Sequence, residues 1–466
     1  MPRQYIVAPQ IAGDLMIGTE GDGLRAYIGR LAESGPSRRL YFGGSGEFVS
    51  LIIGKRGSGK SHTLGTIIES FATQENNTSI SEHKQRRATL LLDPMGNFWT
   101  TAYQVSSQGP KKVRSQYSSL DGWNCGPEEV NVKVYLPAGF KTANDPDFIK
   151  EFRVRLSDLD AADLADLLGI NLFKDAQGAA LSEAFITITE EGWNDGAQHR
   201  APKPDYSITD LAEYLEYLRN HQNGGDHAQV TLRALIRSLR SLERQEVFSG
   251  QGTPLTDLLS LGQLGILMLP HRVGHDLRRV ITRLLIRRIL REREEAAQIR
   301  QRLDVEQLDD MTKQSLEAEL AGRIPRSILA IDEAQELLGD EGGEARRALE
   351  DFCLLGRNYG LSLLMATQRP TTGAISAKVR SQVDLYVIHR LLTQDDIDIC
   401  YSNLLAVYPE EVRAGDRNLK FAELVRLLDP GQAIIAASYA QAQDRVTRVV
   451  TAQIRPRVTV HGGEVS

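Results

Sequence analysis

The sequence has little cysteine and no long apolar run. Only three of its 466 residues are cysteines, and Cys125, Cys353 and Cys400 are far apart in the chain. Neither a disulfide framework nor a zinc site of the usual spacing is therefore expected, which is typical of a reducing cytoplasm. No stretch approaches the roughly 18 apolar residues of a membrane span, and the first residues lack the pattern of a secretion signal. We expect a soluble, cytoplasmic protein without a membrane anchor.

The chain also lacks an excess of positive charge. It carries 55 lysines and arginines against 61 aspartates and glutamates, so its formal net charge is −6. Because an acidic surface repels nucleic acid, any contact with DNA must be confined to local patches. Hydrophobic residues make up 41% of the chain, which is ordinary for a globular protein. The length predicts one large core with insertions or two to three domains.

A glycine-rich segment is the strongest motif in the sequence. Residues 48–53 read FVSLII and predict a buried strand, residues 54–61 read GKRGSGKS, and residues 62–72 have the apolar spacing of a helix. Strand, glycine loop and helix in this order predict a phosphate-binding P-loop, because glycines let backbone N–H groups turn toward phosphate oxygens. The alternative is a glycine-rich turn that matches by coincidence. The predicted nucleotide-binding residues are Gly54, Gly57, Ser58, Gly59, Lys60, Ser61 and His62.

Two side chains of this loop have specific chemistry. Lys60 is expected to reach the β and γ phosphates, and the Ser61 hydroxyl is expected to bind Mg²⁺. A P-loop alone does not distinguish kinases, GTPases, transporters and motors. The rest of the site must therefore indicate the reaction.

Two acidic residues follow a second apolar strand. Residues 326–339 read RSILAIDEAQELLG, which predicts a buried strand that ends at Asp332 and Glu333. Asp332 is predicted to hold the Mg²⁺ shell, and Glu333 is predicted to orient or deprotonate the attacking water. Acidic residues at this position are also compatible with simple capping of the next helix. The adjacent pair favours hydrolysis over phosphoryl transfer to a metabolite.

Polar residues also flank the next predicted strand, which lies in the segment LSLLMATQRP at 361–370. Gln368 follows its end, where ligands of parallel sheets bind, and could sense the γ phosphate. Arg357, in the turn before the strand, could supply positive charge to a phosphoryl transition state, in its own subunit or in a neighbour. The simpler interpretations are a polar strand end for Gln368 and an ordinary turn residue for Arg357.

Four segments together resemble the HerA branch of the HerA/FtsK superfamily of hexameric RecA-like ATPases. They are GKRGSGKS, LLLDPMGNF, ILAIDEAQ and GRNYGLSLLMATQRP, and the resemblance covers about residues 45–102 and 262–455. It implies an α/β fold with a RecA-like P-loop NTPase core and a mainly parallel sheet. It further implies a homo-hexameric ring with ATP and Mg²⁺ at subunit boundaries and double-stranded DNA in a central channel.

The resemblance also implies roles for individual residues. It makes Lys60 and Ser61 ligands of nucleotide and Mg²⁺, Asp332 the Walker B residue, Glu333 the catalytic base, Gln368 the sensor and Arg357 a finger that reaches a neighbouring subunit's nucleotide. One position departs from the family, because Met95 stands where many members have histidine. Asp93 is therefore carried over only as a strand-end residue near the site.

The chain is predicted to have four parts. They are a short β-rich segment at 1–48 that corresponds to a reduced barrel, an ATPase core at 49–102 and 262–455, a mainly helical insertion at 103–261, and a tail at 456–466. Short strands of the first part are predicted at 4–8, 24–29 and 38–42. The serine-rich and glycine-rich stretch 104–127 is predicted to be a loop.

An arginine-rich helix is predicted after the insertion. Residues 272–302 hold ten arginines against four acidic residues, and Arg279, Arg283 and Arg287 lie roughly opposite an apolar face. This stripe could contact DNA phosphates or an acidic partner, or it could be a solvated face balanced by the acidic run at 304–319. The strand-like segment 445–460 could lie across a neighbouring subunit.

Three functions are compatible with these patterns. The first is a hexameric ATP-dependent double-stranded DNA translocase or helicase-type motor that works with a partner nuclease or other effector in DNA end processing or anti-phage defence. The second is an ATP-gated scaffold that assembles and activates an effector, which the acidic charge and short N-terminal segment favour. The third, a conjugation-type or secretion-type coupling ATPase, is disfavoured because such proteins usually carry membrane anchors.

Overall fold

The structure is a computed structural model in two compact units. It describes residues 14–19, 23–32, 38–196, 198–221, 227–338, 343–371, 375–404, 411–414, 417–437 and 448–463. Unit 1 comprises the described residues of Met1–Val134, Leu255–Pro270 and Leu285–Ser466, and unit 2 those of Tyr135–Pro254 and His271–Leu284. The predicted boundaries of the four parts remain predictions.

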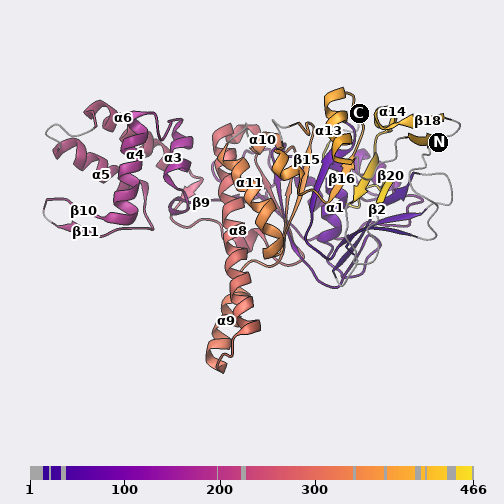
Figure 1. The fold of residues 1–466 in the computed structure, drawn as a ribbon, viewed down its shortest axis with the longest axis horizontal. Helices are drawn as coiled ribbons and strands as arrows, with labels where there is room; N and C mark the ends of the chain where they lie inside the picture. Colours follow the sequence, from indigo (N-terminus) through magenta and orange to yellow (C-terminus); the bar gives the residue numbers. More distant parts are fainter. Residues whose placement is uncertain are drawn as a thin grey trace. The chain divides into compact units, whose positions relative to one another are not determined.

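Unit 1 is built around one large sheet (Figure 1). Its strands are β1 (Leu15–Thr19), β2 (Leu24–Leu31), β3 (Arg39–Gly44), β4 (Val49–Ile53), β6 (Ala88–Asp93), β13 (Leu264–Met268), β14 (Ser327–Ile331), β15 (Leu361–Thr367), β16 (Leu385–Ile388), β19 (Gln432–Ala437) and β20 (Arg448–Ile454). Their order across the sheet is β1-β3-β2-β20-β19-β16-β4-β15-β14-β6-β13. Every pair from β16 to β13 is parallel, which confirms the predicted α/β fold with a mainly parallel sheet.

The strand order determines which residues meet at the site. Strand β15 lies between the P-loop strand β4 and β14, the strand before the acidic pair. In register, Thr367 is opposite Ile53 and Met365 is opposite Ile331. The carboxyl ends of these strands therefore meet at one edge of the sheet, which we call the carboxyl edge. The opposite edge, where the same strands begin, is the amino edge.

The N-terminal strands extend this sheet. Strand β2 contains the stretch predicted at 24–29, β3 overlaps the stretch predicted at 38–42 from Arg39 onward, and β1 is an additional strand. The strand predicted at 4–8 lies outside the described residues. Antiparallel pairing of β2 with β20 and of β20 with β19 joins the segment to the core, and β5 (Ser81–His83) pairs with β2.

Helices and turns of unit 1 connect these strands. They are α1 (Lys60–Phe71), α2 (Lys111–Ser118), α7 (Leu255–Leu258), α9 (Asp310–Gly322), α10 (Gln335–Leu338), α11 (Glu344–Leu355), α12 (Ala377–Arg380), α13 (Gln394–Leu404) and α14 (Phe421–Leu427), with short 3-10 turns at Phe98–Ala102 and Gly356–Tyr359. Strands β17 (Glu411–Ala414) and β18 (Arg417–Lys420) form a separate antiparallel pair. Helix α2 lies within the stretch 104–127, so the prediction that this whole stretch is a loop was wrong.

Helix α8 (His275–Val305) is 31 residues long and belongs to both units. Helix α9 runs beside its C-terminal half (Figure 1). Arg323, just after α9, forms ion pairs with Glu292 and Glu295 of α8. Among the described residues, no helix is both long enough and apolar enough to cross a membrane.

Unit 2 is mainly helical. Its helices are α3 (Ala161–Leu168), α4 (Ala176–Ile186), α5 (Ile208–His221) and α6 (Gln229–Glu243), and its short strands are β8 (Lys150–Phe152), β9 (Val154–Arg155), β10 (Trp193–Asn194), β11 (His199–Arg200) and β12 (Phe248–Ser249). Strand β7 (Val132–Pro137) runs into unit 2 and pairs with β8. Leucines and isoleucines that recur at helical spacing, such as Leu211, Leu215, Leu232 and Leu239, are buried and form its core.

The predicted arginine stripe of α8 is interrupted, because one of its three residues is buried. Arg283 is only 3% exposed and forms ion pairs with Asp163 and Asp166 of α3. Burial raises the pKa of Asp163 to about 6, although Arg283 opposes this shift. Arg279 is half-buried, and Arg287 is exposed. A buried guanidinium needs a carboxylate partner, so Arg283 holds unit 2 together and is unavailable to DNA or to a solvated face.

Candidate active site

The glycine loop between β4 and α1 has a backbone that other residues would not adopt. Gly57 and Gly59 have φ angles of 76° and 112°. At Gly54, a side-chain Cβ would lie 2.4 Å from Ser58 Oγ and 2.7 Å from His389 Cβ. The N–H groups of Gly54, Lys55 and Ser58 donate to backbone carbonyl oxygens. The first turn of α1, which follows the loop, has N–H groups without an intrahelical acceptor, and a helix N-terminus of this kind binds phosphate.

Lys60 begins α1 and contacts the predicted catalytic base. Its Nζ lies 3.4 Å from Glu333 Oε1, and the two side chains are only 4% and 9% exposed. Because both charges are buried, each requires the other or an equivalent partner. A phosphate bound in the loop would compete with Glu333 for the ammonium group, so nucleotide binding and the freedom of the base are linked.

Two glutamines hold the Glu333 carboxylate. Gln368 Nε2 donates to Oε1 over 2.8 Å, and Gln335 Nε2 donates to Oε2 over 2.7 Å. Thr367 Oγ1 in turn donates to Gln335 Oε1 over 2.9 Å. The backbone of Glu333 has a φ of 42°, which is rare outside glycine and recurs at functional sites. The carboxylate is therefore fixed in orientation, as a general base requires.

Ser61 and Asp332 lie together beside this pair. Ser61 Oγ is 3.2 and 3.1 Å from the two carboxylate oxygens of Asp332. Burial, with the neighbouring charges of Glu333 and Asp93, raises the pKa of Asp332 to about 7. A cation next to this carboxylate would compensate its buried charge.

The oxygens of Ser61 and Asp332 fit a magnesium ion. Among the described residues, no cluster of three or more His, Cys, Asp or Glu side chains could hold a metal alone. Mg²⁺ in nucleotide sites takes few protein ligands and completes its shell with phosphate oxygens and water, so two protein ligands suffice. When bound with ATP, Mg²⁺ neutralises charge that develops on the phosphoryl oxygens.

Asp93, the predicted strand-end residue, shapes a turn next to the site. Its buried carboxylate accepts hydrogen bonds from the backbone N–H groups of Met95, Gly96 and Phe98, at 3.1, 2.8 and 2.8 Å. Burial raises its pKa to about 6, although these hydrogen bonds act in the opposite direction. Asp93 thus acts on the site through its charge, which contributes to the raised pKa of Asp332.

His62 directs its ring at the C-terminal segment. Its Nε2 lies 2.9 Å from the carbonyl oxygen of Arg455, and its ring meets that of His461 edge to face at 5.6 Å. Desolvation lowers the pKa of His62 to about 4, so the ring is neutral at pH 7. Any contact of His62 with a nucleotide would therefore come from its backbone N–H rather than from the imidazole.

Arg357 lies at the amino edge, away from the other predicted site residues. It occupies the turn Gly356–Tyr359 directly before β15, is 60% exposed, and its Nη2 lies 2.7 Å from Asp384 Oδ2. The P-loop lies at the other end of the same sheet. The seven residues of β15 span roughly 20 Å at about 3.3 Å per residue. Arg357 therefore cannot reach a nucleotide bound to the P-loop of its own chain.

Sequence reasoning missed His389, which stands behind the P-loop. It follows β16, its Nε2 lies 2.9 Å from Thr63 Oγ1, and its Nδ1 lies 2.8 Å from the carbonyl oxygen of Gln432. Burial lowers its pKa to about 3, so it is a neutral wall of the loop. The available signal in the sequence was a polar residue directly after the apolar run LYVI. Only the pairing of β16 with β4 shows that this residue lies beside the P-loop.

The C-terminal segment 455–461 lies on the P-loop helix of its own chain. Arg455 Nη1 and Arg457 Nε lie 2.6 and 3.5 Å from the carboxylate oxygens of Glu69, and all three side chains are buried. The Thr459 hydroxyl also donates to this carboxylate over 2.7 Å. We predicted that this segment could lie across a neighbouring subunit. In the structure it instead packs on α1 of its own chain through these contacts with Glu69.

This fold and site define a P-loop enzyme that binds and hydrolyses ATP. The family model of the central domain of helicase HerA matches residues 49–289, which is more than half of the chain. The chain therefore belongs to the HerA family, in agreement with the resemblance of its motifs.

Solved structures that match the chain have low sequence identity and TM-scores below 0.5. VirB4 of Thermoanaerobacter pseudethanolicus is 13% identical, with a TM-score of 0.47 over 95% of this chain and 98% of that chain. The plasmid coupling protein TrwB in complex with the ATP analogue ADPNP is 11% identical, with a TM-score of 0.46 over 96% and 98%. The genome packaging NTPase B204 from Sulfolobus turreted icosahedral virus 2 is 10% identical, with a TM-score of 0.30 over 87% and 97%. No curated protein sequence matches the chain.

Proposed function

We propose that this protein is a Mg²⁺-dependent motor that assembles into a hexameric ring in the cytoplasm and moves along double-stranded DNA. It works with a partner nuclease or other effector in DNA end processing or anti-phage defence. Membership of the HerA family supports the DNA substrate. The catalytic residues are Glu333, Lys60, Arg357 and Gln368, and the metal ligands are Ser61 and Asp332.

The separation of Arg357 from the P-loop carries this proposal. An exposed arginine at the amino edge and a phosphate loop at the carboxyl edge cannot act on one nucleotide within one chain. They can do so when the amino edge of one subunit faces the carboxyl edge of the next. A head-to-tail contact of this kind repeats around an axis and closes into a ring.

The site residues divide the work of hydrolysis between two subunits. Lys60 and the loop N–H groups hold the phosphates, while Glu333 accepts a proton from the attacking water. Gln368 keeps the Glu333 carboxylate in place through its 2.8 Å hydrogen bond. Arg357 from the neighbour stabilises negative charge in the transition state. Hydrolysis in one subunit then depends on the position of the next, as a motor requires.

Contacts with DNA must be local in this protein. The net charge of −6 opposes general attraction to DNA, and Arg283 is buried in an ion pair. A translocating ring needs only phosphate contacts that are independent of base sequence. We therefore expect a few exposed basic side chains around the central channel rather than a continuous basic surface.

The separation of Arg357 from the P-loop and the net charge of −6 also support a second candidate function. This function is an ATP-gated scaffold that organises and activates an effector. In a scaffold, ATP would hold the ring together and DNA would not accelerate hydrolysis. A conjugation-type or secretion-type coupling ATPase remains a third alternative. Co-sedimentation with membranes would be expected of it alone.

Steady-state ATP hydrolysis with and without linear duplex DNA distinguishes these functions. The protein would be sized by light scattering, and Glu333→Gln would measure the background rate. We expect hexamers whose Mg²⁺-dependent hydrolysis rises severalfold with DNA and disappears in the variant. Hydrolysis that needs Glu333 but ignores DNA would contradict the motor and favour the scaffold, and a pull-down would then identify the effector. Loss of activity on dissociation to monomers would support ATP sites shared between subunits.

A further inference from the structure

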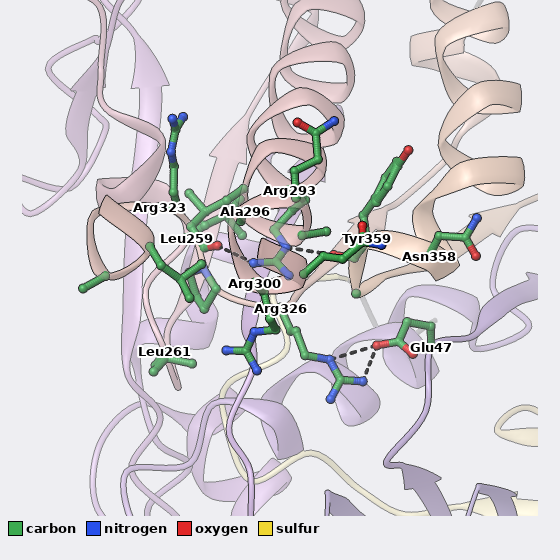
Figure 2. Close-up of a pocket in the computed structure, with 18 of the residues that line it drawn as sticks. Glu47, Leu259, Leu261, Arg293, Ala296, Arg300, Arg323, Arg326, Asn358 and Tyr359 are labelled. Atoms are coloured by element: carbon green, nitrogen blue, oxygen red, sulfur yellow. Dashed lines mark hydrogen bonds and ion pairs between the residues drawn. The ribbon is translucent and has the colours of Figure 1, made fainter. Parts of the chain in front are cut away.

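A large cavity opens at the amino edge of unit 1. It has a volume of about 1370 Å³ and lies between α8, the end of α9, the segment 256–261 and the turn that carries Arg357. Figure 2 shows its lining, with Arg293 of α8 near its centre and Arg326 reaching Glu47. The cavity is separate from the P-loop, which lies at the carboxyl edge of the same strands.

The lining is strongly positive in an acidic protein. Six arginines line the cavity, against the three carboxylates of Glu47, Asp304 and Glu317. The arginines are Arg86, Arg293, Arg300, Arg323, Arg326 and Arg357. The chain as a whole has a net charge of −6. This concentration of cations is therefore a local feature and not a consequence of composition.

Arg293 is fixed in place without a carboxylate. Its Nε donates to the carbonyl oxygen of Tyr359 over 2.9 Å, and its Nη1 donates to that of Ile324 over 2.8 Å. Burial lowers the pKa of Arg293, and the nearby charges of Arg300 and Arg326 lower it further. Carbonyl oxygens orient the guanidinium, and the nearby charge of Glu47 compensates its charge only in part, so an anion in the cavity would be stabilised.

Two more arginines of the lining, Arg86 and Arg300, resemble Arg293 because they have no carboxylate partner among the described residues. Arg86 donates to Asn76 Oδ1 over 2.8 Å and to the carbonyl oxygens of Thr73 and Gln74 over 2.6 Å each, all of which are neutral acceptors. Arg300 is exposed and makes no ion pair with any residue in the described part of the chain.

Of the other arginines, Arg326 shares its acidic partner. Glu47 contacts both Arg326 and the buried Arg87. One carboxylate therefore serves two guanidinium groups at this end of the cavity. Arg323 is paired with Glu292, Glu295 and Glu319, and Arg357 is paired with Asp384. Among the described residues, the lining arginines without a carboxylate partner are therefore Arg86, Arg293 and Arg300.

Apolar side chains form part of the wall. Leu259, Ala296 and Ile324 are almost fully buried and lie behind the arginines, while Leu261 is 60% exposed at the opening. A ligand that matched this surface would combine negative charge with a flat or apolar group. Fixed guanidinium groups bind phosphate with two hydrogen bonds at once, which favours phosphate over other anions.

We propose that this cavity is a second ligand site, which binds a free nucleotide through its phosphate groups and packs the base against the apolar wall. The volume exceeds that of most small-molecule sites, so a mononucleotide or dinucleotide fits. The site is independent of the P-loop and does not require a ring or DNA. It provides a place where the nucleotide pool of the cell acts on α8, the helix shared by both units.

Calorimetric titration of the full chain with ATP tests this proposal. We expect two ATP molecules per wild-type chain, and one per chain in Lys60→Ala, whose circular dichroism verifies the fold. In the Lys60→Ala background, Arg300→Glu should weaken the remaining binding about tenfold, since it reverses a charge beside the phosphates. Arg302→Glu is the matched control, because Arg302 lies on the same helix outside the lining.

Comparison of probes identifies the source of the phosphate. Inorganic tripolyphosphate should bind more weakly than ATP, because it lacks the base. Binding of a short DNA duplex but not of ATP would overturn the proposal. Binding of one ATP per wild-type chain, lost in Lys60→Ala, would overturn it as well. If Arg300→Glu lowered turnover like Arg357→Ala and left only one binding event, the cavity would be part of the neighbour's P-loop site and not a second site.

Discussion

The two edges of the central sheet carry opposite kinds of electrostatic arrangement. At the carboxyl edge, buried charges face partners within the chain, as in the contacts of Lys60 with Glu333 and Ser61 with Asp332. At the amino edge, Arg293 is held by carbonyl oxygens alone and Arg357 is exposed. The same strands separate the two regions. The carboxyl edge is therefore a nearly complete site, whereas the amino edge has guanidinium groups, such as that of Arg293, that have no carboxylate partner in the described part of the chain and would be stabilised by an anion from outside it.

The largest expected effect comes from the base at the carboxyl edge. Glu333→Gln should reduce kcat about 10³-fold, because an amide cannot accept the proton of the attacking water. ATP should still bind, since glutamine preserves the shape of the side chain. Glu336→Gln, which removes one charge three residues later, should leave steady-state turnover unchanged. Turnover of Glu333→Gln within tenfold of the wild type would mean that another group is the base.

Arg357 at the amino edge should contribute to ATP hydrolysis only in the assembled protein. Arg357→Ala should lower kcat about a hundredfold with ATP affinity retained, because it removes charge from the transition state and not from the P-loop. Arg347→Ala, which removes another exposed arginine paired with an acid, is the control.

Mixed assemblies test whether the amino edge of one subunit acts on the ATP site of the next. Arg357→Ala subunits keep an intact P-loop, and Glu333→Gln subunits keep an intact Arg357. Mixing the two inactive proteins should therefore restore ATP hydrolysis if the arginine acts on the neighbouring site. Failure of the mixture to recover activity would remove the support for a role between subunits.

A smaller effect is expected for a residue that only orients the base. Gln368→Ala should lower kcat about tenfold, because it removes one hydrogen bond to a carboxylate. The KM for ATP should change little, since Gln335 still holds the other oxygen of Glu333. Because both glutamines act on the same carboxylate, combining Gln368→Ala with Gln335→Ala should give a non-additive loss. Additive losses would indicate separate roles.

The smallest effect on turnover is expected for the support behind the P-loop. Burial alone would raise the pKa of Glu69, but Arg455 and Arg457 hold it below its ordinary value of 4.5. Glu69→Gln should therefore lower the free energy of unfolding at pH 7 by about 3 kcal/mol and leave kcat at saturating ATP nearly unchanged.

The pH dependence of this effect has a defined sign. A carboxyl group with a depressed pKa stabilises the folded state above its unfolded pKa and loses this contribution as the pH falls through its folded pKa. The difference between wild type and Glu69→Gln in denaturant unfolding should be full above pH 4.5 and shrink below it. Glu75→Gln, an exposed residue after the same helix, is the control. An equally stable Glu69→Gln at pH 7 would show that the ion pairs contribute nothing.

Much of the carboxyl edge could be predicted because its signals are local. The glycines, Lys60 and Ser61 lie within eight residues, and Asp332 directly follows its apolar strand, so chain order alone brings each group to a strand end. The parallel sheet follows from alternating apolar strands and helices. The sequence also indicated Gln368 as a site residue, and its hydrogen bond to Glu333 agrees with that position.

The contacts that sequence reasoning missed join residues far apart in the chain. His389 meets Thr63, Arg283 meets Asp163, and His62 turns to Arg455. A periodic pattern predicts that a helix has a polar face, but not whether another element covers it. The pattern of α8 therefore places Arg283 on a face toward DNA, an acidic partner or solvent, although burial beside a carboxylate is equally compatible with its spacing.

The sequence by itself determined the class of this protein, its phosphate loop and its acidic pair, because these depend on neighbouring residues and on the local geometry of strand, loop and helix. The tertiary structure decided that Arg357 faces away from its own P-loop, that the C-terminal segment packs on its own α1, and that six arginines line one cavity. These features depend on the order of strands in the sheet and on which charges are buried together, and both are set by packing across the whole chain.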